Sequence, residues 1–249
     1  MTDIHSHIIP GIDDGSPDME SSLQMLWMAA ESGVKRIVAT SHCNIPGMFD
    51  NFASDDLILR VKELQDTAKS EEIPIRIAPG MEVFATEDLP DLIRKKKVWT
   101  LNGTKYFLME FSFDEDPDFC FYILRKVRNL GYIPVIAHPE RYYFIQEDPQ
   151  LAFEWCVDGS VLQLNKGSVL GRFGEGPERT AHALIEHGLA ACVASDAHSP
   201  YSRTTDMREL RHVLRSRFGE EPMKLLLEEN PLRIVRGLSL LGYEPTPFY

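Results

Sequence analysis

The chain has few cysteines, no long apolar run and a shortage of positive charge. Its four cysteines form no C-x-x-C pair and no zinc-knuckle spacing, so each is expected to be a small core residue in a reducing compartment. No apolar run reaches the roughly 18 residues that a membrane span needs, so no membrane insertion is expected. Lys and Arg total 26 against 38 Asp and Glu, a net charge of −12 that argues against non-specific nucleic-acid binding.

Two catalytic or binding motifs are also missing. The sixth residue after each cysteine is Phe49, Lys126, Leu162 or His198, never arginine, which excludes the C-x5-R motif of cysteine-dependent tyrosine phosphatases. No G-x-x-x-x-G-K-[ST] phosphate loop is present either. A signal peptide is not expected, because candidate ligands already begin at His5, and the expected location is the cytoplasm.

Strand-like and helix-like segments alternate along the chain, which is the length of one α/β barrel, so residues 1–249 are expected to form a single domain. Helices are expected after Ser16-Pro17 and Ser54 and over about 118–130, 177–187, 205–218, 222–229 and 231–240. Strands are expected at about 2–7, 36–41, 75–82, 105–111, 133–138, 160–165 and 190–196. Several are apolar on both faces, as buried parallel strands are. Seven strands, one short of a regular barrel, predict an open or distorted (β/α)7 barrel.

Six of these seven strands end in, or run directly into, a His, Asp or Glu, and the remaining one ends in Asn165, a poor metal ligand. The carboxyl ends of barrel strands meet at one mouth, so residues far apart in sequence can share a pocket there. The candidate donors are His5, His7, Asp14, His42, Glu82, Glu110, His138, Asp196 and His198. Nine N and O donors exceed what one ion takes, so the pattern predicts a cluster of divalent metals.

Each motif in this set is weak by itself. His5-Ser6-His7 places two imidazoles on one face of a strand, but an isolated H-x-H is often incidental. His42 also fits a satisfied core histidine. Glu82 and Glu110 follow apolar runs, where a lone carboxylate is costly and needs a metal or an arginine as partner. Spacing does not decide whether Asp14 or its neighbour Asp13 is the ligand.

Together these motifs resemble those of the PHP (polymerase and histidinol phosphatase) family of metal-dependent phosphoesterases. They are most similar to the bacterial manganese-dependent protein-tyrosine phosphatases of capsule and exopolysaccharide operons. The resemblance spans residues 2 to about 240 and rests on DIHSHIIPGIDDG at 3–15, ATSH at 39–42, GME at 80–82, MEF at 109–111, AHPERY at 137–142 and SDAH at 195–198. One departure is that Ser41 and Cys43 stand where the subgroup usually has Pro and His, which bears on substrate preference more than on metal binding.

The resemblance implies a distorted barrel that holds three divalent ions, with manganese expected and iron, zinc or magnesium as alternatives. It groups His5, His7, Glu82 and Asp196 on one ion, with Glu82 bridging to a second ion held by Glu110 and His138. A third ion takes Asp14, His42 and His198. Arg141 and Arg203 match positions that hold phosphate, and His42 is expected to serve in catalysis as well as in metal binding.

The implied activity is hydrolysis of phosphotyrosine on a protein, with the tail of a bacterial tyrosine autokinase as partner. Two alternatives stay open: a small-molecule phosphatase such as a histidinol-phosphate phosphatase, and a non-catalytic metal-dependent module that binds phosphotyrosine. Tyr142, Tyr143, Phe144 and Phe49 either offer ring faces to the substrate or pack their own loops. The sequence assigns no oligomeric state, and no role to Tyr243 and Tyr249 near its end.

Overall fold

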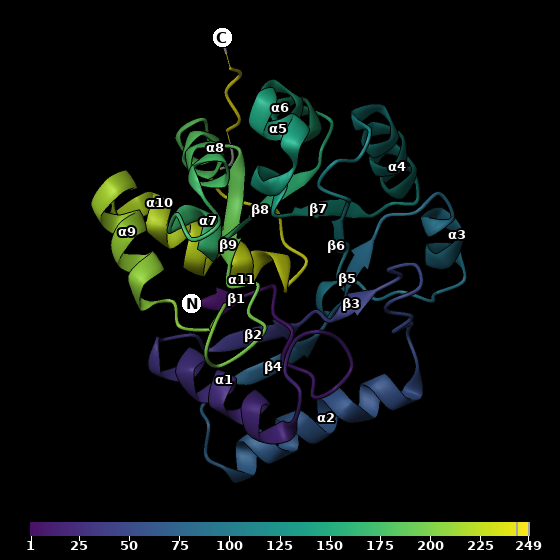
Figure 1. Ribbon diagram of the computed structural model, residues 1–249, viewed down its shortest axis with the longest axis vertical. Helices are drawn as coiled ribbons and strands as arrows, with labels where there is room; N and C mark the ends of the chain where they lie inside the picture. Colours follow the sequence, from purple (N-terminus) through teal and green to yellow (C-terminus); the bar gives the residue numbers. More distant parts are fainter. Residues whose placement is uncertain (243, 249) are drawn as a thin grey trace.

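The strands are arranged around the centre of the molecule and the long helices lie outside them (Figure 1). The computed structural model describes residues 1–242 and 244–248, so Tyr243 and Tyr249 lie outside the described residues. One sheet has the order β1 (Thr2–Asp3), β2 (Arg36–Ala39), β4 (Arg76–Pro79). The other has the order β3 (His42–Cys43), β5 (Glu82–Phe84), β6 (Tyr106–Glu110), β7 (Ile133–Ala137), β8 (Val161–Asn165), β9 (Ala190–Ala194). Every pairing in these two sheets is parallel, which confirms the predicted α/β class.

The predicted ring of seven strands is divided into two sheets because two strands are interrupted. β2 ends at Ala39, within the segment expected at 36–41, and β3 follows at His42; likewise β4 ends at Pro79, within the segment expected at 75–82, and β5 begins at Glu82. Gly80 lies at the second interruption, where an added Cβ would stand only 2.7 Å from Val38 Cγ1. The loops after β1 and β9 hydrogen-bond to each other, with the Asp196 N–H donating to His5 O at 2.9 Å and the His7 N–H to Ala197 O at 2.8 Å. These bonds join the first and last strands at the mouth of the ring.

The long helices lie around the outside of the ring (Figure 1), and α1, α2 and α4 begin at side-chain caps. Ser54 accepts from the Leu57 N–H and starts α2, as expected, whereas Asp18 rather than Ser16 caps α1. The last helix ends at Ile234 instead of continuing to 240. The helices are α1 (Met19–Glu31), α2 (Asp55–Ser70), α3 (Leu89–Arg94), α4 (Pro117–Asn129), α5 (Tyr143–Glu147), α6 (Gln150–Val157), α7 (Lys166–Val169), α8 (Glu175–Glu186), α9 (Arg208–Phe218), α10 (Glu220–Lys224) and α11 (Asn230–Ile234), with short turns at Leu101–Gly103, Pro139–Arg141 and Leu225–Glu229.

Alternate residues of the strands pack on opposite sides of the sheets. Leu108 of β6 and Val135 of β7 belong to a core inside the ring, which Ile234 of α11 also joins. Met109 and Ile136, their neighbours in sequence, pack outward against the helices. A strand side chain repeats its direction every second residue, so β6 directs its last residue, a glutamate, into the ring.

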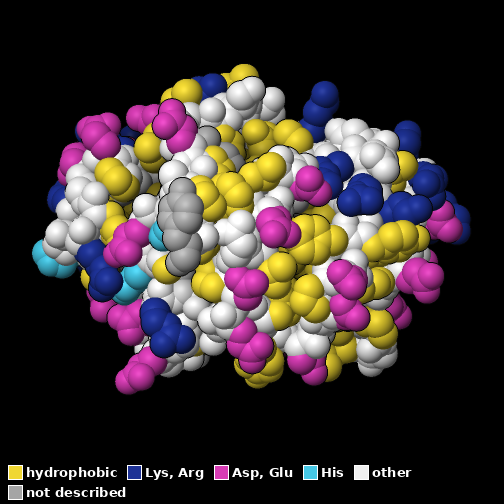
Figure 2. Space-filling view, turned by 90° about the horizontal axis from the view of Figure 1, so that it is seen from above, with side chains coloured by type: hydrophobic (Ala, Val, Ile, Leu, Met, Phe, Trp, Pro, Cys, Tyr) yellow, Lys and Arg dark blue, Asp and Glu magenta, His cyan; other side chains and the backbone are white. Residues whose placement is uncertain are grey.

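Figure 2 shows one face of the molecule, on which acidic side chains are scattered among apolar ones while Lys and Arg gather toward one end. This distribution agrees with the net negative charge of the chain. Within residues 1–242 and 244–248, none of the helices combines the length and the apolar character needed to cross a membrane.

Candidate metal centre

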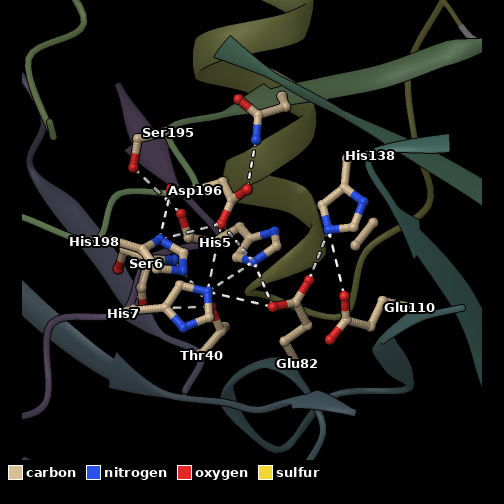
Figure 3. Close-up of polar contacts among 12 residues, drawn as sticks. His5, Ser6, His7, Thr40, Glu82, Glu110, His138, Ser195, Asp196 and His198 are labelled. Atoms are coloured by element: carbon tan, nitrogen blue, oxygen red, sulfur yellow. Dashed lines mark hydrogen bonds and ion pairs between the residues drawn. The ribbon is translucent and has the colours of Figure 1, made fainter. Parts of the chain in front are cut away.

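The nine predicted donors lie together, and all of them except Asp14 and His42 are labelled in Figure 3. Eight of them fall into three groups whose ligand atoms lie within 4.8 Å of one another: His5, His7, Glu82 and Asp196; His7, Asp14, His42 and His198; and His42, Glu82 and Glu110. His138 adjoins the last group, with its Nε2 at 3.0 Å from Glu82 Oε1 and 3.7 Å from Glu110 Oε2. The structure thus brings all nine residues to one place, and their roles as ligands stay a prediction.

Glu82 lies at the centre of this cluster and is fully buried at the start of β5. Its Oε2 lies 3.1 Å from His5 Nε2, 3.3 Å from His7 Nε2 and 3.0 Å from His42 Nδ1. Its Oε1 faces His138 Nε2 on the other side. A carboxylate whose two oxygens face different sets of imidazoles is suited to bridge two cations.

The cluster contains several buried polar atoms without a well-formed hydrogen bond. Glu82 Oε2, Glu110 Oε1, Asp196 Oδ1, His42 Nδ1 and His198 Nε2 have no partner of hydrogen-bond geometry among the described residues. Unsatisfied buried polar atoms cost about 1–3 kcal/mol each in proteins. Their gathering in one pocket of mixed N and O donors fits a divalent-metal centre.

Carboxylates and imidazoles in the cluster strongly perturb each other's protonation. Burial disfavours the charged form of His42, but the Glu82 charge and the Glu110 carboxylate 3.0 Å from Nδ1 outweigh it and raise the pKa of His42 to about 10. Burial likewise disfavours ionised Glu82, yet His5 and His42 hold the pKa of that carboxyl well below its usual range. The pKa values of His5 and His7 are raised as well, so protons on His5, His7 and His42 balance the negative charges, and a cation that binds here must displace them.

Outer partners orient several of the imidazoles. The His7 Nδ1–H donates to Asp13 Oδ2 at 2.9 Å, and the His5 Nδ1–H donates to Gln163 Oε1 at 2.7 Å. Each bond leaves the Nε2 lone pair directed into the cluster, the arrangement found in histidine metal ligands. Asp13 also accepts from the backbone N–H groups of Gly15 and His42.

Asp14 takes the position in the cluster that spacing alone left open between it and Asp13. Its Oδ1 lies 3.5 Å from both His42 Nε2 and His198 Nε2, and its side chain is about half exposed at the mouth. A hydrogen bond to His198 is the main cause that lowers the pKa of Asp14. His42 therefore takes part in two of the donor groups: its Nε2 faces Asp14, and its Nδ1 faces Glu82.

Arg141 and Arg203 border the cluster. Arg203 Nη2 donates to Asp196 Oδ2 at 2.5 Å, and Arg141 Nη1 lies 3.8 Å from the same oxygen. The Arg141 guanidinium lies between two rings, 4.4 Å from the centroid of Phe113 and 4.6 Å from that of Phe173. Both arginines keep part of their side chains exposed, so a substrate can reach them.

A family model described as capsular polysaccharide synthesis, CpsB/CapC, matches residues 1–236. The chain belongs to the CpsB/CapC family. It is 35% identical over 251 residues to the tyrosine-protein phosphatase YwqE of Bacillus subtilis (strain 168), covering 99% of this chain and 96% of that protein. It is 30% identical over 246 residues to the putative tyrosine-protein phosphatase CapC of Staphylococcus aureus, with 98% and 92% covered.

Solved structures give the same result for this CpsB/CapC family member. It superposes with a TM-score of 0.93, 34% identity and 100% coverage of both chains on a crystal structure from the study of YwqE from Bacillus subtilis and CpsB from Streptococcus pneumoniae, described as unique metal-dependent tyrosine phosphatases. A histidinol phosphate phosphatase from Lactococcus lactis is similar with a TM-score of 0.55 at 12% identity, covering 86% of this chain and 93% of that one. The second likeness shows the fold alone.

Sequence reasoning missed the supporting residues of this CpsB/CapC family member. Asn165, set aside as a poor ligand, donates its Nδ2–H to Asp196 Oδ2 at 2.5 Å. Gln163 lies two residues earlier on the same strand, so both side chains point to the same side, where Gln163 reaches His5 after β1 and Asn165 reaches Asp196 after β9. Polar residues at alternate positions of an otherwise apolar strand were the available signal.

The aromatic residues near the mouth are mostly structural. Tyr142 is fully buried, and its hydroxyl donates to Ala137 O and accepts from the Phe111 N–H, so it packs its own loop. Phe49 stacks on His42 with ring centroids 5.7 Å apart. Tyr143 is 59% exposed, so its ring is more accessible than those of Tyr142, Phe144 and Phe49.

Proposed function

We propose that this chain is a metal-dependent protein-tyrosine phosphatase, that residues 1–249 form one domain, and that it acts in capsule or exopolysaccharide synthesis. The observation that carries the proposal is the shared carboxylate Glu82 among the imidazoles of His5, His7, His42 and His138. Membership of the CpsB/CapC family supports it, as do relatives named tyrosine-protein phosphatases. The proposed substrate protein is a bacterial tyrosine kinase that carries phosphotyrosine on its tail.

We propose three divalent ions, with manganese as the ion in the cell and iron, zinc or magnesium as competitors. His5, His7, Glu82 and Asp196 would hold one, Glu110 and His138 would share Glu82 on a second, and Asp14, His42 and His198 would hold a third. When bound, such ions supply a nucleophile from water at neutral pH and neutralise phosphate oxygens. The mixed imidazole and carboxylate donor set is compatible with each of these metals.

The chain's own residues bind and orient the phosphate ester. Arg141 and Arg203 present planar guanidinium groups beside Asp196, and such groups hold two phosphate oxygens each with fixed geometry. His42 is 13% exposed at the mouth, whereas His5 and His7 are sealed below it, so His42 is the proposed catalytic imidazole. A phenol of pKa about 10 leaves more readily than an alcohol, which reduces the need for a dedicated general acid.

We also propose a cytoplasmic location. The thiols of Cys43, Cys120 and Cys192 are buried and reduced, and burial raises the pKa of Cys43 to about 12. Buried, protonated thiols of this kind are typical of proteins that work in a reducing compartment.

Phosphate release by the purified, manganese-loaded protein tests the activity. We expect hydrolysis of a phosphotyrosyl peptide and of p-nitrophenyl phosphate, both abolished by a chelator and restored by added manganese. Faster hydrolysis of histidinol phosphate would indicate a small-molecule phosphatase instead. Tight binding of the phosphopeptide without hydrolysis would indicate a non-catalytic module. Intact substrates with no effect of the chelator would contradict both the activity and its metal dependence.

A further inference from the structure

A lysine is buried beside the metal centre, directly after the one strand that ends without a predicted ligand. Lys166 follows Asn165 at the end of β8 and is 2% exposed. Lysine is almost never fully buried unless its charge is paired, because the loss of hydration is costly. The mechanism proposed above gives this residue no role.

The Lys166 ammonium holds the backbone that follows Arg203. Its Nζ donates to the carbonyl oxygen of Thr204 and to that of Asp206, the latter at 3.0 Å. Among the described residues, none of its hydrogen bonds reaches a predicted metal ligand. The buried carboxylate of Asp3 lies near enough to favour the charged form, although burial is the larger effect and lowers the pKa of Lys166 to about 8.

The same backbone is fixed at two other points. The Thr205 hydroxyl donates to Met25 O at 2.5 Å, and the His198 N–H donates to Arg203 O at 2.9 Å. These hydrogen bonds connect Arg203 and its neighbours to Lys166 directly after β8, to Met25 of α1 and to His198 of the metal centre. So many hydrogen bonds to the short segment 203–206 indicate that its backbone conformation has to be held in place.

The backbone conformation of Arg203 explains why this segment has to be held in place. Its φ is 49°, in the left-handed region that residues with a side chain rarely adopt. Such a conformation costs on the order of 1–3 kcal/mol and persists only where the surroundings fix it. From this conformation the guanidinium reaches Asp196 while about a third of the side chain faces solvent.

We propose that Lys166 is a positioning residue for phosphate binding, whose ammonium fixes the carbonyls of Thr204 and Asp206 and so directs Arg203 toward the substrate. The inference rests on the proposed role of Arg203 as a phosphate ligand. It adds that Lys166, directly after β8, supports the anion side of the site, whereas Gln163 and Asn165 of β8 hold predicted metal ligands.

The test uses the full, manganese-loaded chain with Lys166→Met, which keeps the aliphatic length and removes the ammonium. We expect the inhibition constant for inorganic phosphate and the KM for p-nitrophenyl phosphate to rise at least about tenfold, since misplacing a binding group by about 1 Å can cost up to about a hundredfold. Bound manganese per chain should stay unchanged. Lys62→Met, at an exposed position of α2, is the matched control and should change neither constant.

A double-mutant cycle separates positioning from general damage. In an Arg203→Ala background, Lys166→Met should change the phosphate inhibition constant less than about twofold, because neighbours that act through one group are not additive. An equal rise in both backgrounds, or no rise from Lys166→Met, would overturn the inference. If Arg203→Ala by itself leaves phosphate inhibition unchanged, the proposed role of Arg203 has failed instead.

Thr205→Val gives a second, independent reading should Lys166→Met fold poorly. It removes only the hydroxyl that binds Met25 O and loosens the same segment from its other side. We expect a weaker rise in the phosphate inhibition constant, again absent in the Arg203→Ala background. A rise that persists in that background would contradict the proposed coupling.

Discussion

Glu82 is the residue on which most of the site converges, because each of its oxygens faces different imidazoles. Glu82→Gln keeps the shape but replaces one ligand oxygen by an amide NH2, which cannot bind a cation. We expect loss of most bound manganese and a fall in kcat/KM of at least about a hundredfold, since removing even an outer partner of a ligand costs about 10–100-fold. Elemental analysis and p-nitrophenyl phosphate kinetics measure both. The exposed Glu87→Gln is the control, and full metal content in Glu82→Gln would contradict the bridging role.

Asp13 and Asp14 are adjacent in sequence but differ in what they contact. Asp13 holds the His7 Nδ1–H and two backbone N–H groups, so it orients a ligand without facing the cluster. Asp13→Asn should weaken manganese binding about ten- to hundredfold while saturating manganese restores most activity. Asp14→Asn removes a predicted ligand, so excess metal should restore little. Titration of activity with manganese distinguishes them, with Asp50→Asn as control; identical titrations would contradict the assignment.

The rings of Phe113 and Phe173 hold the Arg141 guanidinium flat between them. Phe173→Leu removes one of these faces, and a cation–π contact at a partly exposed site is worth about 0.5–1 kcal/mol. We expect the KM for a phosphotyrosyl peptide to rise about two- to fivefold, with kcat changed less. Phe121→Leu, which loses a ring that packs on Trp155, is the control. An unchanged KM in Phe173→Leu would show that Arg141 keeps its position without the ring.

At the scale of elements, β4 ends the three-stranded sheet, and its open edge is covered by one side chain. Gln65 Oε1 accepts from the Ile77 N–H at 2.8 Å, and Pro79 has no N–H to satisfy. Gln65→Leu should lower the free energy of unfolding by about 1–3 kcal/mol by leaving that N–H unpaired, and should promote edge-to-edge association. Urea denaturation and light scattering measure the two effects. Glu63→Leu adds the same apolar surface to α2 and should change neither; equal behaviour of the two variants would contradict the capping role.

The periodicity of the strands was sufficient to predict the α/β class and the convergence of the donors, since most of the nine lie at or directly after an apolar run; Asp14, in an acidic loop, is the exception. It was not sufficient to predict the interruptions between β2 and β3 and between β4 and β5. Those depend on close packing at Gly80, which only the folded neighbours create. Gln163 and Asn165 were missed for a similar reason. Their partners, His5 and Asp196, lie 158 and 31 residues away, and no local pattern links them.

At the scale of the whole molecule, the cluster makes stability depend on pH. The stability of the metal-free protein falls as pH rises, whereas the stabilisation by bound metal grows. The folded-state pKa of His42, about 10, lies above its ordinary 6.5, so its contribution to stability is full below pH 6.5 and disappears as pH rises through about 10. Bound cations compete with those protons, so metal binding strengthens as pH rises. Chelator-treated protein should therefore show a Tm that falls between pH 6.5 and 9, whereas the stabilisation by manganese grows over that range. Differential scanning fluorimetry measures both, and a rising Tm of the metal-free protein would contradict the protonated state of His42.

The residues of the proposed metal centre come from distant parts of the chain. His5 and His7 stand near the start, whereas Asp196 and His198 lie almost two hundred residues later, and the loops that carry them are joined by hydrogen bonds. During synthesis, the early histidines leave the ribosome long before the acid and imidazole that complete their site exist. The full set of proposed ligands can therefore hold a metal ion only after the segment that carries Asp196 and His198 has been synthesised and β1 and β9 have met.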